Sequence, residues 1–333
     1  MVKNMFSGDG HGTNRETASA PVKTLLTDTE VEIRLNRASQ FVADGNLSSA
    51  VDELLVVIEH NSDNVESQAM LGSLLLAVEQ FDAAENLLVS ACELSKWSKP
   101  EVIANLAIVF REKGEYSMGV KVLTKGLDTA GVLDSNGIIS IGIADLQMLA
   151  QNYSSAAEWY LLACFKQPHN INLWIEASTL NFPIKYRDLK FAENVLLQGL
   201  DFNPGHGELL YNLGLTLHLK DRLDDAIVLY YEALKFNDQS ALTLSALATA
   251  LHSVGNFDAA LSLYKKSLLI DSSNVVVLSN FALLLNAVGN ASEGVEYSKK
   301  ALSIDPTSSD ALRAHAECLA TLSATTVSST PEL

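Results

Sequence analysis

The residues best suited to bind a metal ion are two histidines, His218 and His252, which lie 34 positions apart (252 − 218 = 34). Packed helices have axes about 8–10 Å apart, so histidines at equivalent positions of neighbouring helices could share a ligand. A structural zinc site, however, has about four protein ligands, and two imidazoles are an incomplete set. We therefore predict no metal site and interpret both histidines as surface residues that contact a protein partner or water.

Sequence signatures of catalysis are missing from the chain. It contains no Gly-x-Ser-x-Gly, His-Glu-x-x-His, Walker or Cys-x-x-Cys motif. Gly8, Gly10 and Gly12 are spaced like a phosphate-binding loop, but no Gly-Lys-Ser/Thr follows them. We predict that the protein is not an enzyme and uses no cofactor.

The three cysteines, Cys92, Cys164 and Cys318, have no paired spacing. A disulfide framework or a structural zinc site is therefore not expected. Each cysteine falls within a helical pattern, so we predict that all three are small buried apolar side chains. Unpaired cysteines indicate a reducing compartment.

Net charge limits the classes of partner. The formal net charge is −17, with a pI near 4.7. Such a surface repels phosphate backbones, so we predict no nucleic-acid binding, and it favours basic peptides or basic protein patches. No window approaches the roughly 18 uninterrupted apolar residues of a membrane-spanning helix, and the N-terminus lacks the apolar stretch of a signal peptide. We expect a soluble cytoplasmic protein without membrane insertion.

The elements that must position any binding residues follow a repeat. Its clearest markers are leucines at a constant step of 34 positions: Leu210, Leu244, Leu278 and Leu312. A fixed step of this length that carries two helical stripes is typical of helix–turn–helix repeat arrays. The sequence thus predicts an all-α solenoid over residues 29–322, with disordered segments at 1–28 and 323–333.

Two motifs recur within each repeat. The first helix carries Leu210-x-x-Leu213-Gly214-x-x-Leu217, and the second carries Ala226-x-x-x-Tyr230-x-x-Ala233. This pattern resembles the tetratricopeptide repeat, and it extends over most of the chain. The resemblance implies a right-handed superhelical solenoid that binds other proteins. Small residues such as Ala226 and Ala260 allow helices to approach closely, so an aspartate there would be strongly destabilising.

We divide the array into about eight repeats and one capping helix. The predicted repeats are 31–64, 65–98, 100–133, 137–170, 171–206, 207–240, 241–274 and 275–308, and the capping helix is 309–322. The middle repeats are longer than 34 residues, and Pro183 predicts an extended loop there because proline cannot continue a helix. This irregularity is either a bend with a partner-specific loop or neutral variation in loop length.

Four asparagines mark a candidate peptide-binding groove. In tetratricopeptide-repeat proteins that hold extended peptides, a first-helix asparagine often binds the peptide backbone, and the matching positions here are Asn36, Asn105, Asn212 and Asn280. This arrangement is similar to the superhelix of O-linked N-acetylglucosamine transferase. An amide can donate to and accept from a peptide group, so it gives affinity without sequence preference. Other repeats interrupt the series, and asparagine is common at this position of the family. We also place His218 and His252 in this groove.

The functional hypotheses differ in the surface that they use. The first is a non-catalytic adaptor that binds a segment of a partner protein in the concave groove. The alternative is a structural scaffold subunit of a larger complex, which exposed apolar residues on the convex side would favour. A regulatory part of an enzyme is a third hypothesis. Groove positions such as Leu35 and Ala69 lack the basic residues of a carboxylate clamp, so binding of acidic chaperone tails is not expected.

Overall fold

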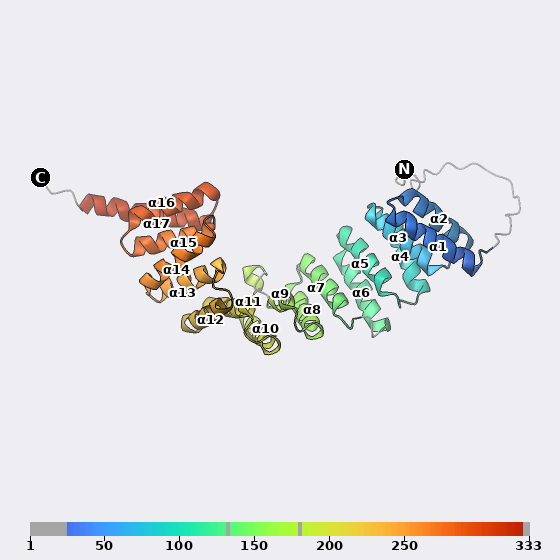
Figure 1. The fold of residues 1–333 in the computed structure, drawn as a ribbon, viewed down its shortest axis with the longest axis horizontal. Helices are drawn as coiled ribbons and strands as arrows, with labels where there is room; N and C mark the ends of the chain where they lie inside the picture. Colours follow the sequence, from blue (N-terminus) through green and yellow to red (C-terminus); the bar gives the residue numbers. More distant parts are fainter. Residues whose placement is uncertain (1–24, 131–133, 179–181, 329–333) are drawn as a thin grey trace. The chain divides into compact units, whose positions relative to one another are not determined.

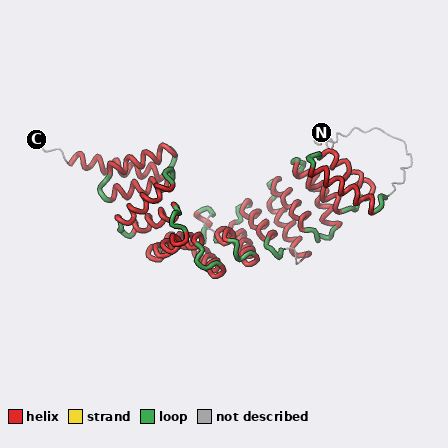
Figure 2. Tube along the Cα trace, viewed as in Figure 1, coloured by secondary structure: helices red, strands yellow, loops and turns green. Residues whose placement is uncertain are grey.

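The computed structural model describes residues 25–130, 134–178 and 182–328, and these residues contain seventeen α helices and no strand (Figures 1 and 2). They form two compact units, unit 1 up to Lys166 and unit 2 from Gln167 onward. Within the described part of the chain, no helix is both long and apolar enough to cross a membrane.

Unit 1 consists of four helix pairs. The first helices of the pairs are α1 (Asp28–Ala43), α3 (Val65–Ala77), α5 (Pro100–Glu112) and α7 (Ile138–Leu149). The second helices are α2 (Leu47–His60), α4 (Phe81–Leu94), α6 (Tyr116–Ala130) and α8 (Tyr153–Lys166). Each second helix packs against the first helix of its own pair, and α2, α4 and α6 also pack against the first helix of the next pair.

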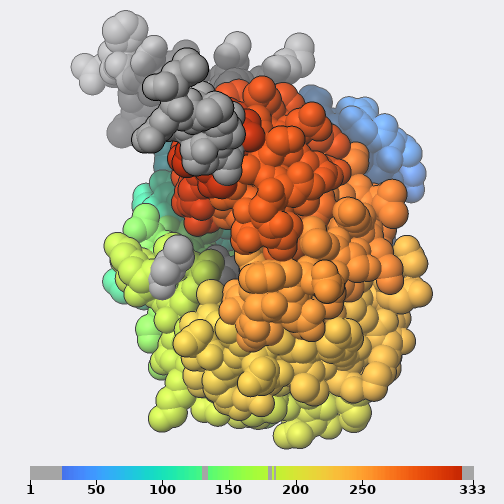
Figure 3. Space-filling model, turned by 90° about the vertical axis from the view of Figure 1, so that its left-hand side faces the viewer, coloured from blue at the N-terminus to red at the C-terminus, as the bar shows by residue number. Residues whose placement is uncertain are grey.

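Unit 2 continues the pattern with four pairs and one further helix. The first helices are α9 (Ile171–Ala177), α11 (Gly207–Leu219), α13 (Ala241–Ser253) and α15 (Val275–Ala287). The second helices are α10 (Leu189–Phe202), α12 (Leu223–Phe236), α14 (Phe257–Ile270) and α16 (Ala291–Ile304). The last helix, α17 (Ser309–Ser328), packs against α15 and α16. The helices of this unit follow one another in chain order from yellow-green to red in Figure 3.

Small residues hold the paired helices together, as the motif predicts. Ala226 and Ala260 are fully buried, and so are the large side chains of Tyr230 and Tyr264 beside them. A Cβ atom added to Gly214 would lie 2.8 Å from the Tyr230 ring. A larger residue at these positions would therefore separate the helices of a pair.

The turns within pairs depend on residues that adopt left-handed backbone conformations. Gly255 and Gly289 follow α13 and α15 with φ angles of 81° and 83°, which glycine adopts without strain. The connection between α9 and α10 is longer, since it spans Ser178 to Asp188, whereas Lys220–Arg222 suffices between α11 and α12. The extended loop predicted around Pro183 is thus confirmed.

An ion-paired lysine joins successive pairs at an equivalent position of each unit. In unit 1, Lys113 at the end of α5 lies 2.9 Å from Asp82 and 2.6 Å from Glu85 of α4. In unit 2, Lys220 at the end of α11 pairs with Glu193 of α10, to which Arg222 also binds at 2.9 Å. These bridges link the first helix of one pair to the second helix of the pair before it.

The cysteines behave as predicted. Cys92, Cys164 and Cys318 are free thiols, and all three are buried. Burial raises the pKa of both Cys92 and Cys164 to about 12. These thiols therefore stay protonated and serve as packing groups.

The predicted ends of the solenoid need a correction. Thr27 caps α1 and belongs to a capping box with Glu30, so ordered structure begins before residue 29. At the other end, α17 continues to Ser328 instead of stopping at residue 322, since neither proline nor glycine interrupts residues 323–328. The remaining residues of the segments predicted to be disordered, 1–24 and 329–333, lie outside the described part.

Candidate functional site

The longer first helices of unit 2 share a set of accessible residues. Most members of this set on α11, α13 and α15 are three or four positions apart, which places them on one side of each helix. We call this surface the first-helix face. Its members are Glu208, Tyr211, Asn212, Leu215, His218, Leu242, Ser245, Ala246, Thr249, His252, Val276, Asn280, Leu283 and Asn286.

The first-helix face carries almost no charge. Glu208 is its single carboxylate, and it has no ion-pair partner among the described residues. Burial lowers the pKa of His252 and also that of His218, where Asp221 opposes the shift. Both imidazoles are therefore mainly neutral at pH 7.

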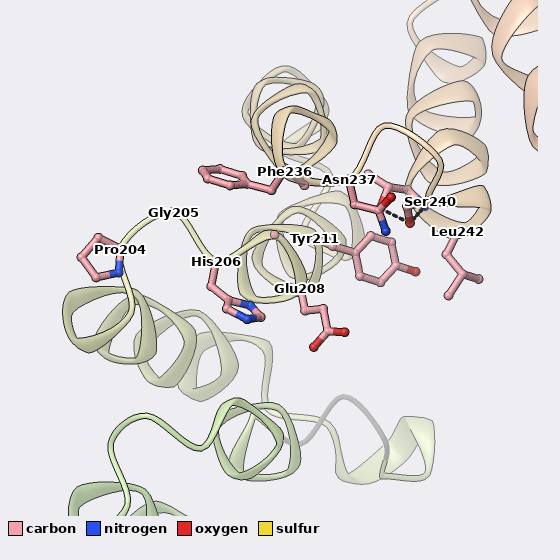
Figure 4. Close-up of a pocket in the computed structure, with 12 residues that line it drawn as sticks. Pro204, Gly205, His206, Glu208, Tyr211, Phe236, Asn237, Ser240 and Leu242 are labelled. Carbon is pink, nitrogen blue, oxygen red and sulfur yellow. Dashed lines mark hydrogen bonds between the residues drawn. The ribbon is translucent and has the colours of Figure 1, made fainter.

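A cavity of about 560 Å³ opens where α11 begins (Figure 4). Glu208 lies between His206 and Tyr211, and Leu242 of α13 lies beyond the tyrosine. Phe236 at the end of α12 also lines the cavity. The sequence motifs did not indicate this cavity, which combines aromatic rings with one carboxylate that has no ion-pair partner among the described residues.

The start of α11 differs from the starts of its neighbours. Ser240 and Asn274 cap α13 and α15 with their side chains, whereas His206 makes no capping hydrogen bond. The Nδ1 atom of His206 is buried and has no hydrogen-bond partner in the described structure. A histidine in place of the usual capping residue was a sequence signal that could have revealed the cavity.

Unit 1 has a smaller apolar cavity of about 170 Å³ between its first helices α5 and α7. Ile108 and Ile138 line it, together with Gly142, where an added Cβ atom would lie 3.2 Å from the Leu123 side chain. Arg111 and Asp145 add charge to its lining. Asp145 also accepts a hydrogen bond of 2.6 Å from the Tyr160 hydroxyl.

Two segments of unit 2 match sequence profiles of a known protein family. Sequence profiles described as "Tetratricopeptide repeat" match residues 188–241 and 243–274. The chain is a tetratricopeptide-repeat protein. No curated protein matches its sequence.

Solved structures agree with this tetratricopeptide-repeat fold. The C-terminal part of a TPR repeat-containing protein from Cytophaga hutchinsonii has 12% identity and a TM-score of 0.54, with 74% of this chain and 98% of that chain covered. Yeast Tom70 has 16% identity and a TM-score of 0.51, with 94% of this chain and 69% of that chain covered. At such low identity the likeness concerns the fold alone.

The four predicted asparagines lie on first helices of the tetratricopeptide repeats, two in each unit. In unit 1, Asn36 is exposed on α1, and Asn105 on α5 donates a hydrogen bond of 2.7 Å to the Ser73 hydroxyl of α3. In unit 2, Asn212 donates to the Glu208 carbonyl of its own helix at 2.8 Å, and Asn280 is half-buried on α15. Two of the amides thus already serve internal hydrogen bonds.

The two predicted histidines lie in the last turns of α11 and α13. The His252 ring packs edge-on against Phe257, with centroids 5.8 Å apart. Across the described residues, no group of three or more His, Cys, Asp and Glu side chains could hold a metal ion. The neutral rings of His218 and His252 each offer a partner one hydrogen-bond donor and one acceptor.

Proposed function

We propose that the protein is a non-catalytic adaptor that binds an extended segment of a partner protein on the first-helix face of unit 2. Tetratricopeptide repeats are protein-interaction modules, so a binding role is expected of this chain. The observation that supports this particular surface is the pair Leu242 and Val276. They occupy equivalent positions (276 − 242 = 34) and are 59% and 54% exposed.

The chemistry of the surface suggests what the segment would be like. Exposed aliphatic groups favour apolar side chains, because burying them removes apolar area from water. Asn212 and Asn280 retain amide groups that could bind a peptide backbone. Glu208 would accept one basic side chain, so we propose a mainly uncharged segment with a basic residue near the start of α11.

The test is affinity purification of the intact protein beside an Asn36/Asn105/Asn212/Asn280→Ala variant, with partners identified by mass spectrometry. A control variant, Asn86→Ala/Asn194→Ala, removes two exposed asparagines from second helices, one in each unit. We expect the fourfold variant to stay folded by circular dichroism and to lose a partner that the control retains. Retention of every partner by the fourfold variant would refute the proposal.

A scaffold role remains the second candidate, because one observation favours it. Leu269, on the second helix α14, is 86% exposed. An exposed leucine on a second helix suits lateral contact with another subunit. We propose the cytoplasm as the location, since the three free cysteines suit a reducing compartment.

A further inference from the structure

A second cavity of unit 2 is lined by none of the residues of the first-helix face. It measures about 470 Å³ and lies between the second helices α12 and α14. Tyr231 and Leu234 of α12 line it, and Leu263, Leu269 and Ile270 of α14 line it as well. Because Leu269 is 86% exposed, the wall that it forms is open to a partner.

Four lysines lie in the C-terminal halves of α14 and α16. Lys265 and Lys266 on α14 recur after 34 positions as Lys299 and Lys300 on α16 (299 − 265 = 34). All four are exposed, and none forms an ion pair with a described residue. Lys266 also lines the cavity. In a chain with a net charge of −17, this is a local concentration of unneutralised positive charge.

Among the acidic residues of α14 and α16, Glu296 lies one helical turn before Lys299 and Lys300. Asp258, Glu293 and Glu296 belong to the N-terminal halves of these helices. Asp271 and Asp305 follow the helix ends, where each accepts a hydrogen bond from the backbone of the next turn. Asp238 lines the cavity together with Lys266. Lys265 and Lys266 have no carboxylate one helical turn away on α14, so they can meet anionic groups from outside.

Helix stabilisation alone accounts for only part of this pattern. Lysines in the C-terminal half of a helix interact favourably with the macrodipole. That effect does not require an apolar cavity beside them, and it does not explain an almost fully exposed leucine. The combination of cavity, leucine and lysines indicates a ligand that is both apolar and acidic.

We infer that the outer face of α14 and α16 binds a protein segment in which acidic residues accompany a bulky apolar side chain. The apolar side chain enters the cavity beside Leu269 and Tyr231, and the carboxylates pair with the lysines. A walled cavity fits a single protruding side chain better than it fits a flat lipid surface. This surface is separate from the first-helix face and has the opposite charge preference.

Fluorescence anisotropy with synthetic peptides tests the inference on the full chain. The probe is a short fluorescein-labelled peptide in which Glu alternates with Leu. Matched peptides carry Lys in place of every Glu, or Ser in place of every Leu. We expect the Glu–Leu peptide to bind at least about tenfold more tightly than either matched peptide, and its affinity to fall as salt increases.

Variants then locate the site. Lys265→Glu/Lys266→Glu and, separately, Leu269→Ser should each weaken Glu–Leu binding by about tenfold or more. These side chains are exposed, so the fold should persist, which circular dichroism checks. Two controls, Lys190→Glu on α10 and Asn280→Ala on the first-helix face, should bind as the natural chain does.

Four outcomes would overturn the inference. The first is equal binding of the Glu–Leu and Lys–Leu peptides, and the second is an equal loss of affinity in Asn280→Ala. The third is a dimer in size-exclusion chromatography with light scattering that Leu269→Ser dissociates, because the occupant would then be a second copy. The fourth is binding to phosphatidylserine vesicles without binding to the peptide, which would indicate a membrane surface.

Discussion

Units 1 and 2 share their packing but differ in their accessible residues. Lys113 and Lys220 form the same inter-pair bridge, and the small residues of each pair are buried in both units. The cavity between α5 and α7, however, is lined by Arg111 and Asp145, whereas the first-helix face of unit 2 has Glu208 as its single charged group at pH 7. The repeat thus fixes the buried positions and leaves the accessible ones free to specify different partners.

The largest expected effect comes from placing a charge in a buried contact of one unit. Ala260→Asp should destabilise unit 2, and Ala84→Asp should destabilise unit 1, each by about 3–5 kcal/mol, because an unpaired carboxylate would be buried. Hydrogen–deuterium exchange read by mass spectrometry measures each unit separately. Equal exchange in units 1 and 2 of either variant would mean that the two units unfold together and do not differ in stability.

The start of α7 in unit 1 should be more sensitive than the start of α11 in unit 2. Asp134 is buried, accepts a 2.8 Å hydrogen bond from the Ile139 amide, and pairs with Lys166 at 2.5 Å. We expect Asp134→Asn to lower the free energy of unfolding by about 2–3 kcal/mol. Urea denaturation measures the loss, and Asp128→Asn on the exposed side of α6 is the matched control.

The same residue should make unit 1 sensitive to acid. Burial raises the pKa of Asp134, but the hydrogen bonds from Lys166, Ser140 and Ile139 outweigh it, so the net shift is downward. A lowered folded-state pKa gives stability that is present above the unfolded value, about 3.9, and is lost as the pH falls through the folded value. Asp134→Asn should remove this pH dependence, and an unchanged acid transition would contradict the assignment.

The inter-pair bridges should have unequal strength. Glu193 holds both Lys220 and Arg222, whereas Lys113 can retain Asp82 when Glu85 is lost. Glu193→Gln should therefore cost about 1 kcal/mol in unit 2, and Glu85→Gln less than that in unit 1. Thermal unfolding at low and at high salt compares the two variants. A larger loss for Glu85→Gln than for Glu193→Gln would contradict this predicted order.

The smallest expected effect is a gain of stability at the cavity of unit 2. His206→Asn would supply the cap that Ser240 and Asn274 give to the neighbouring first helices. We expect the free energy of unfolding to rise by about 0.5–1 kcal/mol. Chemical denaturation measures it, with His206→Ala as the control that lacks a capping oxygen. No gain over alanine would mean that the asparagine does not form the cap.

Buried positions were predictable from the sequence, and accessible ones were much less so. The step of 34 correctly located Ala226, Ala260 and Tyr230, because a closely packed interface admits few residue types. The internal hydrogen bond of Asn105 was not predictable, since it depends on Ser73 of another helix. Leu269 was also missed, because an apolar residue in a helix is normally assigned to the core.

The last helix, α17, shows how a repeat array could gain a further repeat. Leu278 is fully buried beneath α16 and α17, whereas Leu312, its equivalent one repeat later, is 50% exposed on α17. A second helix appended after α17 would cover that leucine without disturbing any existing contact. Because each repeat meets only its neighbours, growth by duplication of a 34-residue module requires one new interface and no redesign of the old ones.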